Sequence, residues 1–272
     1  MIKKKNMLKD NCKNSKQLFK YLCEKARTHN CYKCYSTLER ITKIRDTNAL
    51  YIGNGSKWND ITDRSDFNDE SSEFINFGKS FSFSKEESVA MWMLYGGIHK
   101  LGGMIDFTQK GINSILETKK IYLGYFDGDD FIEISELSRE KFNIFLIDMI
   151  YYKENTRSYY IKRSDESYNN LSKSIFSKLK LCKKAYGWQY ENECRLIISI
   201  NKMFIPKKCD TVKIDLSGMD MGKSFERIYR GPNYPLDDVK NSLPSKLADT
   251  IDWSLCDESN CQKNNHVKAS LT

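Results

Sequence analysis

The stretch Tyr190-Glu-Asn-Glu-Cys-Arg-Leu-Ile-Ile-Ser-Ile200 decides how this sequence is interpreted. Charged and apolar residues alternate along it, and successive side chains of a strand point to opposite faces. Glu191, Glu193 and Arg195 would therefore share one face, with the apolar residues on the other. Two carboxylates two residues apart have Cβ atoms roughly 7 Å apart, close enough to address one ligand. The pattern predicts a half-buried strand that presents charges.

The paired glutamates allow two interpretations. Like charges this close raise the pKa of one group, so that one carboxyl can act as an acid or base while the other stays ionised. In the other interpretation the face is solvated, and Glu193 and Arg195 simply form an ion pair. The sequence leaves both open.

Hydrophobic periodicity predicts helices and strands along the whole chain. Helices are expected over residues 15–28, from a Ser36 cap through Ile44, from a capping box of Ser84 and Glu87 through Tyr95, and over 108–118, 136–152, 165–181, 223–229 and 237–250. Strands are expected over residues 48–52, 79–84, 102–107, 120–126, 131–135, 190–200 and 211–216. This order predicts an α+β fold with a mixed, mainly antiparallel central sheet and peripheral helices.

The domain organisation is predicted to be simple. Residues 1–252 are expected to form a single domain with an N-terminal amphipathic helix, and residues 253–272 a polar, flexible tail. Residues 59–76 are acidic and lack periodicity, which is typical of a surface loop that can act as a lid.

The composition indicates a folded protein of the cytoplasm. Of 272 residues, 40% are hydrophobic and only 4 are proline. No run approaches the roughly 20 apolar residues that cross a bilayer, and the basic start lacks the apolar region of a secretory signal. Nine cysteines in such a chain are expected to be free thiols. Cys31 and Cys34 have zinc-ligand spacing, but no second pair follows, so no metal is predicted.

Basic residues are unevenly distributed in a chain of net charge +8. Residues 1–47 hold thirteen Lys and Arg against four Asp and Glu, and residues 177–208 hold eight against two. Such patches concentrate a phosphate-bearing partner, although a lysine-rich solvated surface is the alternative.

Several short blocks between Tyr32 and Gly231 resemble the bacterial family called domain of unknown function 2971. They are Tyr32-Lys-Cys-Tyr-Ser36 with Leu38; Leu50-Tyr51 with Trp58-Asn-Asp60; Phe81-Ser-Phe-Ser84; Met91-Trp92 with Tyr95; Gly103-Met-Ile-Asp-Phe107; and Trp188-Gln-Tyr-Glu-Asn-Glu-Cys-Arg195. That family is in turn similar to the ADP-ribosyltransferases, in which a basic residue, a serine-containing strand and a late glutamate occur in this order. Lys33 stands here where arginine or histidine is usual.

The resemblance implies a split sheet of the ADP-ribosyltransferase kind and NAD as a substrate. It implies that Glu193 stabilises the oxocarbenium-like ribose formed when the nicotinamide bond breaks, and that Glu191 deprotonates the acceptor. The implied NAD contacts are Lys33, Tyr35, Ser82, Ser84, Trp92, Tyr95 and Arg195. Trp92 and Tyr95 can equally be core aromatics, and Ser84 a helix cap.

The sequence does not identify the acceptor of ADP-ribose, which can be a protein, a nucleic acid or water. A bacterial toxin or phage-defence role is an expectation from the resemblance alone. The main rival is a non-enzymatic module whose basic regions bind nucleic acid or a protein. A metal-dependent nuclease using Asp60, Asp63 and the two glutamates ranks last.

Overall fold

The computed structural model describes residues 14–56, 58, 60, 63–64, 69–96, 102–154, 158–163, 169–176, 178–219, 224–231 and 251–253. The chain divides into two compact units. The first unit comprises Met1–His29, Leu50–Phe81 and Asn113–Leu216, and the second comprises Asn30–Ala49, Ser82–Ile112 and Ser217–Thr272. The single domain expected from the sequence stays a prediction.

The first unit holds most of the strands. Its elements are α2 (Ser15–Ala26), β2 (Ala49–Gly53), β3 (Phe74–Ser82), α6 (Gln109–Leu116), β5 (Lys120–Asp127), β6 (Asp130–Ser138), η2 (Arg139–Lys141), β7 (Phe142–Asp148), β8 (Ile150–Glu154), β9 (Ser158–Lys162), β10 (Asn169–Ser172), α7 (Lys173–Phe176), η3 (Lys180–Cys182), β11 (Lys183–Ala185), η4 (Tyr186–Glu191), β12 (Glu193–Asn201), η5 (Lys202–Phe204) and β13 (Thr211–Asp215). β2, β3 and α6 each have an end in the second unit.

Antiparallel pairing dominates the larger sheet of this unit. β12 pairs with β7 in a register that runs from Cys194 opposite Asp148 to Ile200 opposite Phe142. β12 also pairs with β3, so it lies between two strands. β13 pairs with β5, and β5 with β6, again antiparallel. β12 is consequently buried along nearly its whole length.

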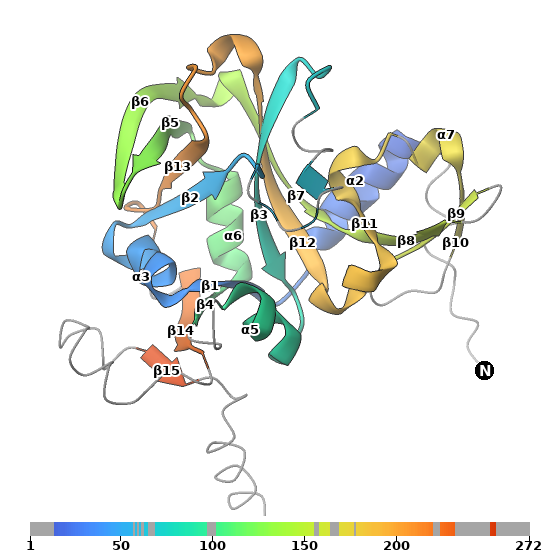
Figure 1. Cartoon of the computed structure of the whole chain (residues 1–272), viewed down its shortest axis with the longest axis horizontal. Helices are drawn as coiled ribbons and strands as arrows, with labels where there is room; N and C mark the ends of the chain where they lie inside the picture. Colours follow the sequence, from blue (N-terminus) through green and yellow to red (C-terminus); the bar gives the residue numbers. More distant parts are fainter. Residues whose placement is uncertain are drawn as a thin grey trace, which may run out of the picture. The chain divides into compact units, whose positions relative to one another are not determined.

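A smaller sheet has the order β10-β9-β8-β11. β8 and β9, and β9 and β10, are antiparallel, whereas β11 runs parallel to β8. Helix α2 packs over this region (Figure 1): Leu18 and Leu22 join Ile147, Ile150 and other buried residues in one core cluster. Asn14 caps α2 by accepting a hydrogen bond from the Gln17 amide. The amphipathic helix predicted here is confirmed, although Phe19 of the predicted apolar stripe is 37% exposed.

The second unit contains β1 (Tyr32–Thr37), α3 (Leu38–Asp46), α5 (Val89–Tyr95), β4 (Gly102–Phe107), β14 (Phe225–Arg230) and β15 (Ile251–Trp253). β4 pairs antiparallel with both β1 and β14, and β14 runs parallel to β15. The predicted α+β class and the mainly antiparallel pairing are therefore confirmed.

Three predicted helices are wrong. Residues 136–152 form the end of β6, then η2, β7 and β8, and residues 223–229 fall mostly in β14. Within 165–181, only Lys173–Phe176 is α-helical among the described residues. A strand buried on both faces carries a continuous apolar run, which periodicity cannot distinguish from a buried helix. The predicted helix over 237–250 and nearly all of the predicted tail lie outside the described residues.

Two predicted helix caps are shifted along the chain. Thr37, not Ser36, caps α3 by accepting from the Arg40 amide. Ser88, not Ser84, caps α5, and Glu87 accepts from the indole of Trp92 instead of completing a capping box with Ser84.

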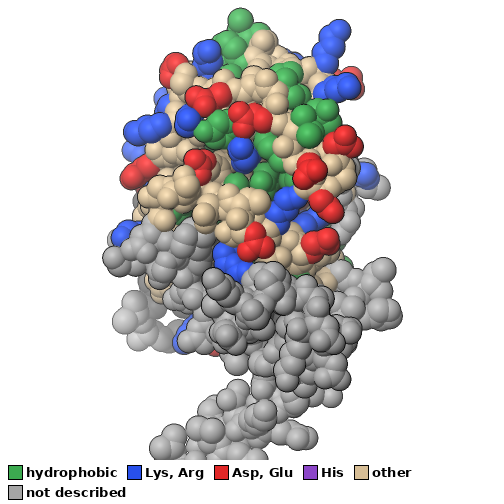
Figure 2. Space-filling view, turned by 90° about the vertical axis from the view of Figure 1, so that its left-hand side faces the viewer, with side chains coloured by type: hydrophobic (Ala, Val, Ile, Leu, Met, Phe, Trp, Pro, Cys, Tyr) green, Lys and Arg blue, Asp and Glu red, His purple; other side chains and the backbone are tan. Residues whose placement is uncertain are grey.

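Acidic and basic side chains are interspersed around hydrophobic ones on the side of the molecule shown in Figure 2. On β6, Glu133 pairs with Lys213 and Glu136 with Lys120. Such a mixed surface offers no strong attraction to a polyanion.

None of the described helices is long and apolar enough to cross a membrane.

Candidate functional site

Glu193 is fixed at the first position of β12 by its backbone. The chain leaves η4 at Glu191, and Asn192 then adopts a left-handed conformation with φ 45° and ψ 55°. The Glu193 amide donates to the Tyr151 hydroxyl at 2.8 Å, and its carbonyl accepts from the Met149 amide at 3.0 Å. This turn corrects the sequence prediction, because Glu191 ends a 3₁₀ helix and does not lie on the strand.

The Glu193 carboxylate accepts hydrogen bonds from three side chains. Ser80 Oγ donates to Oε1 at 2.5 Å, and Arg195 Nε donates to the same oxygen at 2.8 Å. Lys184 Nζ lies 3.0 Å from the other oxygen. Only 2% of Glu193 is exposed, so the alternative of a solvated strand face is wrong, although the Glu193–Arg195 ion pair that it included is present.

Arg195 links Glu193 to Asp63. Its two terminal nitrogens donate to the two Asp63 oxygens at 3.1 and 2.9 Å, the bidentate geometry in which guanidinium binds carboxylate most strongly. The Trp58 ring lies against the guanidinium, 4.5 Å from centroid to carbon. Arg195 is 1% exposed, so water does not screen these contacts.

Lys184 joins the two predicted catalytic residues. Its ammonium lies 2.5 Å from Glu191 Oε2, 3.0 Å from Glu193 Oε2 and 3.6 Å from Asp63. We call Asp63, Lys184, Glu191, Glu193 and Arg195 the buried charge cluster. Three carboxylates face two cations, which leaves one formal negative charge in excess.

Electrostatics favour the charged forms of Glu193, Lys184 and Arg195. Burial by itself would raise the pKa of Glu193, but Arg195 and Lys184 outweigh it and hold that pKa well below its ordinary value. Burial would lower the pKa of Lys184, but Glu193 and Glu191 raise it instead. The sequence predicted that one of the glutamates would have a raised pKa; for Glu193 the shift has the opposite sign, because cations separate the carboxylates.

The serine that meets Glu193 is Ser80, two residues before the predicted Ser82. Ser82 is buried, and its hydroxyl accepts from the Ser84 amide at 3.4 Å. Ser80 belongs to the first unit, whereas Ser82 and Ser84 belong to the second, as do Lys33, Tyr35, Trp92 and Tyr95.

The side chains predicted to contact NAD in the second unit have structural partners. Lys33 donates to the carbonyls of Ser84 and Lys85 at 2.5 and 2.6 Å and is 6% exposed. Trp92 is fully buried and meets the Tyr35 ring edge to face at 5.0 Å. Tyr95 is partly buried and packs against the core cluster that Tyr35 and Trp92 form with Met91 and Met104. The ammonium of Lys33 is thus used to hold the chain that enters α5.

Ser80, Asp63 and Lys184 are cluster contacts that the sequence did not assign to NAD chemistry. Ser80 alternates with Ser82 and Ser84, so the sequence predicts that the three serines lie on one side of the strand. It does not predict that Ser80 contacts Glu193. Asp63 figured only in the nuclease alternative. Nothing in the sequence around Lys184 distinguishes this buried lysine from the lysines of the surface.

The cysteine and histidine residues near the N-terminus have other contacts. His29 Nε2 lies 2.7 Å from Asp148 Oδ1, and Cys31 Sγ contacts the Ser84 carbonyl at 3.4 Å. Within the described part of the chain, no group of three His, Cys, Asp or Glu side chains is arranged to hold a metal.

No protein-family model, curated protein or solved structure matches this chain.

Proposed function

We propose that this chain is an ADP-ribosyltransferase-like enzyme that cleaves the nicotinamide glycosidic bond of NAD and transfers ADP-ribose to a macromolecular acceptor. Membership of the domain of unknown function 2971 family and a split sheet of the ADP-ribosyltransferase kind are parts of this proposal. The observation that carries it is the burial, the lowered pKa and the hydrogen bonding of the Glu193 carboxylate. It is an ionised, nearly inaccessible carboxylate at the start of a late strand, oriented by a serine of β3 and by Arg195.

The proposed chemistry uses the charge of the cluster. When the bond between ribose C1 and the nicotinamide nitrogen breaks, its electron pair leaves with nicotinamide, and positive charge develops on the ribose. A preorganised carboxylate stabilises that charge most strongly where water is excluded. The excess negative charge of the cluster has the required sign.

Movement of Lys184 would make one oxygen of Glu193 available to the ribose. Its contact with Glu193 is longer than its contact with Glu191, 3.0 against 2.5 Å. A small movement of the ammonium away from Glu193, with its contact to Glu191 kept, would free Glu193 Oε2 for a ribose hydroxyl. The acceptor nucleophile would then attack C1, and Glu191, the second carboxylate on the same ammonium, would take its proton.

The second unit contributes less to this proposal than the sequence implied. Lys33 donates hydrogen bonds to two backbone carbonyls, and Trp92 is buried in the core. Phosphate contact by Lys33 and stacking by Trp92 on nicotinamide are therefore not part of the proposal. Contacts of Tyr35, Ser82, Ser84 and Tyr95 with NAD stay predictions. A toxin or phage-defence role likewise stays an expectation.

The test is release of nicotinamide from NAD by the purified protein, with mass spectrometry of RNA, DNA and protein acceptors for added ADP-ribose. Glu193→Gln is expected to lower the rate by about 10²–10³-fold. Ser80→Ala keeps the carboxylate but removes one donor, and should cause a smaller loss. Glu133→Gln, which removes a partly exposed carboxylate of β6, is the matched control and should keep full activity.

Two results would overturn the proposal. One is full activity of Glu193→Gln that circular dichroism shows to be folded. The other is absence of nicotinamide release by the wild-type protein with all three acceptor classes present. Nucleic-acid binding that survives Glu193→Gln, without any NAD turnover, would favour the non-enzymatic module.

A further inference from the structure

Asp63 is the member of the buried charge cluster that comes from a distant part of the chain. Lys184, Glu191, Glu193 and Arg195 all lie between β11 and the start of β12. Asp63 lies between β2 and β3, 132 residues from Arg195. The four local residues are two cations and two carboxylates, so their charges balance without Asp63. Asp63 therefore supplies the excess negative charge of the cluster.

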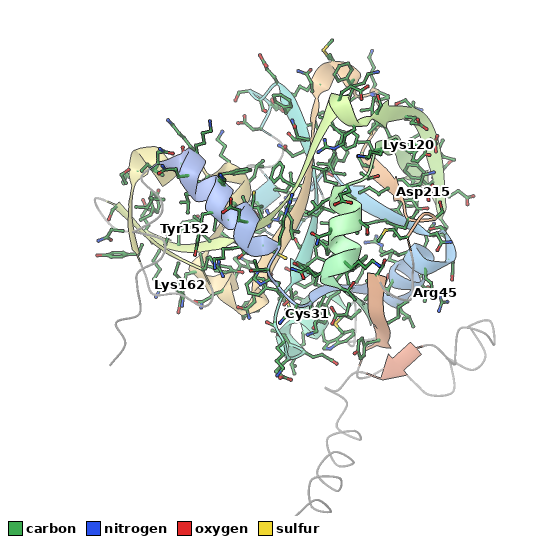
Figure 3. All side chains as sticks on the ribbon, turned by 180° about the vertical axis from the view of Figure 1, so that it is seen from behind. Cys31, Arg45, Lys120, Tyr152, Lys162 and Asp215 are labelled. Atoms are coloured by element: carbon green, nitrogen blue, oxygen red, sulfur yellow. The ribbon has the colours of Figure 1, made fainter. Side chains whose placement is uncertain are left out.

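Strand pairing fixes the ammonium of Lys184. Lys184 lies opposite Tyr151 in the parallel pair of β11 and β8, one residue before the Tyr152 that Figure 3 labels. The Tyr151 hydroxyl accepts from the Glu193 amide, and the Lys184 ammonium binds the Glu193 carboxylate. The sheet and Glu193 thus hold this cation in place.

The turn that carries Asp63 lies at the surface. Asp60 begins it: its Oδ1 accepts from the Asp63 amide at 3.3 Å, and its carbonyl accepts from the Arg64 amide at 3.0 Å. Trp58, Asp60 and Arg64 are partly exposed, whereas Asp63 is only 4% exposed. Asp63 therefore points inward from a turn that is otherwise in contact with solvent.

The Asp63 carboxylate occupies an arrangement of donors that suits a phosphate. Its two oxygens bind the two terminal nitrogens of Arg195, and one of them lies 3.6 Å from the Lys184 ammonium. A guanidinium binds two phosphate oxygens in the same bidentate way, and an ammonium binds phosphate as a point charge. A phosphate also has oxygens outside one plane, so it can bind the guanidinium and approach the ammonium together.

The charge of the cluster would survive this exchange. A phosphate in a diester carries one negative charge, as the Asp63 carboxylate does. Replacing one by the other keeps one negative charge in excess and keeps the donors of Arg195 paired, so no cation is left buried without a partner. Burying the extra carboxylate costs desolvation free energy that the balance among the four local residues does not require.

We infer that Asp63 is an internal substitute for a singly charged phosphate group, and that Arg195 and Lys184 bind this group when Asp63 leaves them. The contact of Asp63 with the two cations is thus autoinhibitory: it closes an anion-binding site beside Glu193. The ligand class is a small molecule with a phosphate diester or a pyrophosphate diester.

The experiment is isothermal titration calorimetry of the full chain with ADP-ribose, a pyrophosphate diester, and with adenylyl-adenosine, a phosphate diester. Asp63→Ala removes the competing carboxylate and should bind roughly ten- to 150-fold more tightly than the wild type, the effect of one hydrogen bond to a charged group. Asp63→Asn keeps the shape and one acceptor oxygen, so its gain should be smaller. It decides the test if circular dichroism shows that the alanine variant is unfolded. Adenosine lacks phosphate and should bind all variants alike.

The matched control is Asp69→Ala, which removes a carboxylate that pairs with the exposed Lys180 at the surface. It should bind like the wild type. Adding Arg195→Lys to Asp63→Ala keeps the charge but not the bidentate donors, and should remove the gain. Adding Lys180→Gln instead should leave the gain intact.

Three results would overturn the inference. One is equal affinity of the folded Asp63 variants and the wild type for both phosphate ligands. The second is a gain that survives Arg195→Lys, and the third is the same gain with adenosine. A gain with either phosphate ligand supports it, and comparison of the two shows which diester is preferred.

The choice of ADP-ribose as a probe rests on the proposed function, but binding is measured without NAD. The two proposals therefore fail separately. Loss of nicotinamide release in Glu193→Gln, with no gain of binding in the Asp63 variants, would refute this inference alone. A gain of binding without any NAD turnover would refute the proposed reaction alone.

Discussion

Replacing Glu193 by glutamine tests whether the buried charge cluster is as dry and as tightly paired as its geometry indicates. Glutamine keeps the size of the side chain and one acceptor oxygen, but it removes the charge that faces Arg195 and Lys184. Removing one partner of a buried ion pair costs about 3–5 kcal/mol. Arg195 keeps Asp63 and Lys184 keeps Glu191, so we expect the lower end, about 3 kcal/mol.

The same variant makes a pH prediction with a definite sign. The pKa of Glu193 in the folded protein lies well below its ordinary value of 4.5. Between these two pKa values the unfolded chain binds the proton and the folded protein does not, so the stability that Glu193 contributes is lost as the pH falls. The stability difference between wild type and Glu193→Gln should be full near neutral pH and should narrow as the pH drops below 4.5.

Urea denaturation followed by tryptophan fluorescence measures the difference, with Trp58 and Trp188 beside the cluster as reporters. Glu133→Gln is the control, because Glu133 is 43% exposed where it pairs with Lys213 and should cost only about 0.2–1 kcal/mol. A loss in Glu193→Gln no larger than in this control would refute the reasoning. A difference that stays constant from about pH 7 to about pH 3.5 would refute the electrostatic part of it.

Two further predictions concern the thiols and the turn before β12. Burial raises the pKa of Cys23 and of Cys182 to about 12, so both should resist iodoacetamide at about pH 8 in the native protein and react after unfolding in urea; labelling of either in the native state would contradict this. At Asn192, glycine should leave the urea midpoint nearly unchanged, whereas valine should cost about 1–2 kcal/mol because of the positive φ; equal midpoints for the two variants would show that the turn is not needed.

The sequence predicted helices and strands well where the spacing of apolar residues was clear and the element depends on interactions between near neighbours in the chain. Helix α2 was predicted from its apolar spacing, and β4, β5 and β13 were found within a residue or two. The run from Phe142 to Tyr152 was assigned to a helix because its length fits a helix, and only its pairing with β12 makes β7 a strand. Local pattern carries no information about which strand will supply hydrogen bonds.

For the candidate site, the sequence by itself determined the identity of three charged residues, Glu191, Glu193 and Arg195, and little of their environment. Tertiary structure decided that they are buried, that Glu191 ends a 3₁₀ helix, and that a lysine separates the two carboxylates. It also brought in Ser80 and Asp63, which lie 113 and 132 residues away along the chain from their partners. The physical reason is that burial and charge pairing depend on distance in space, which alternation along one strand does not encode.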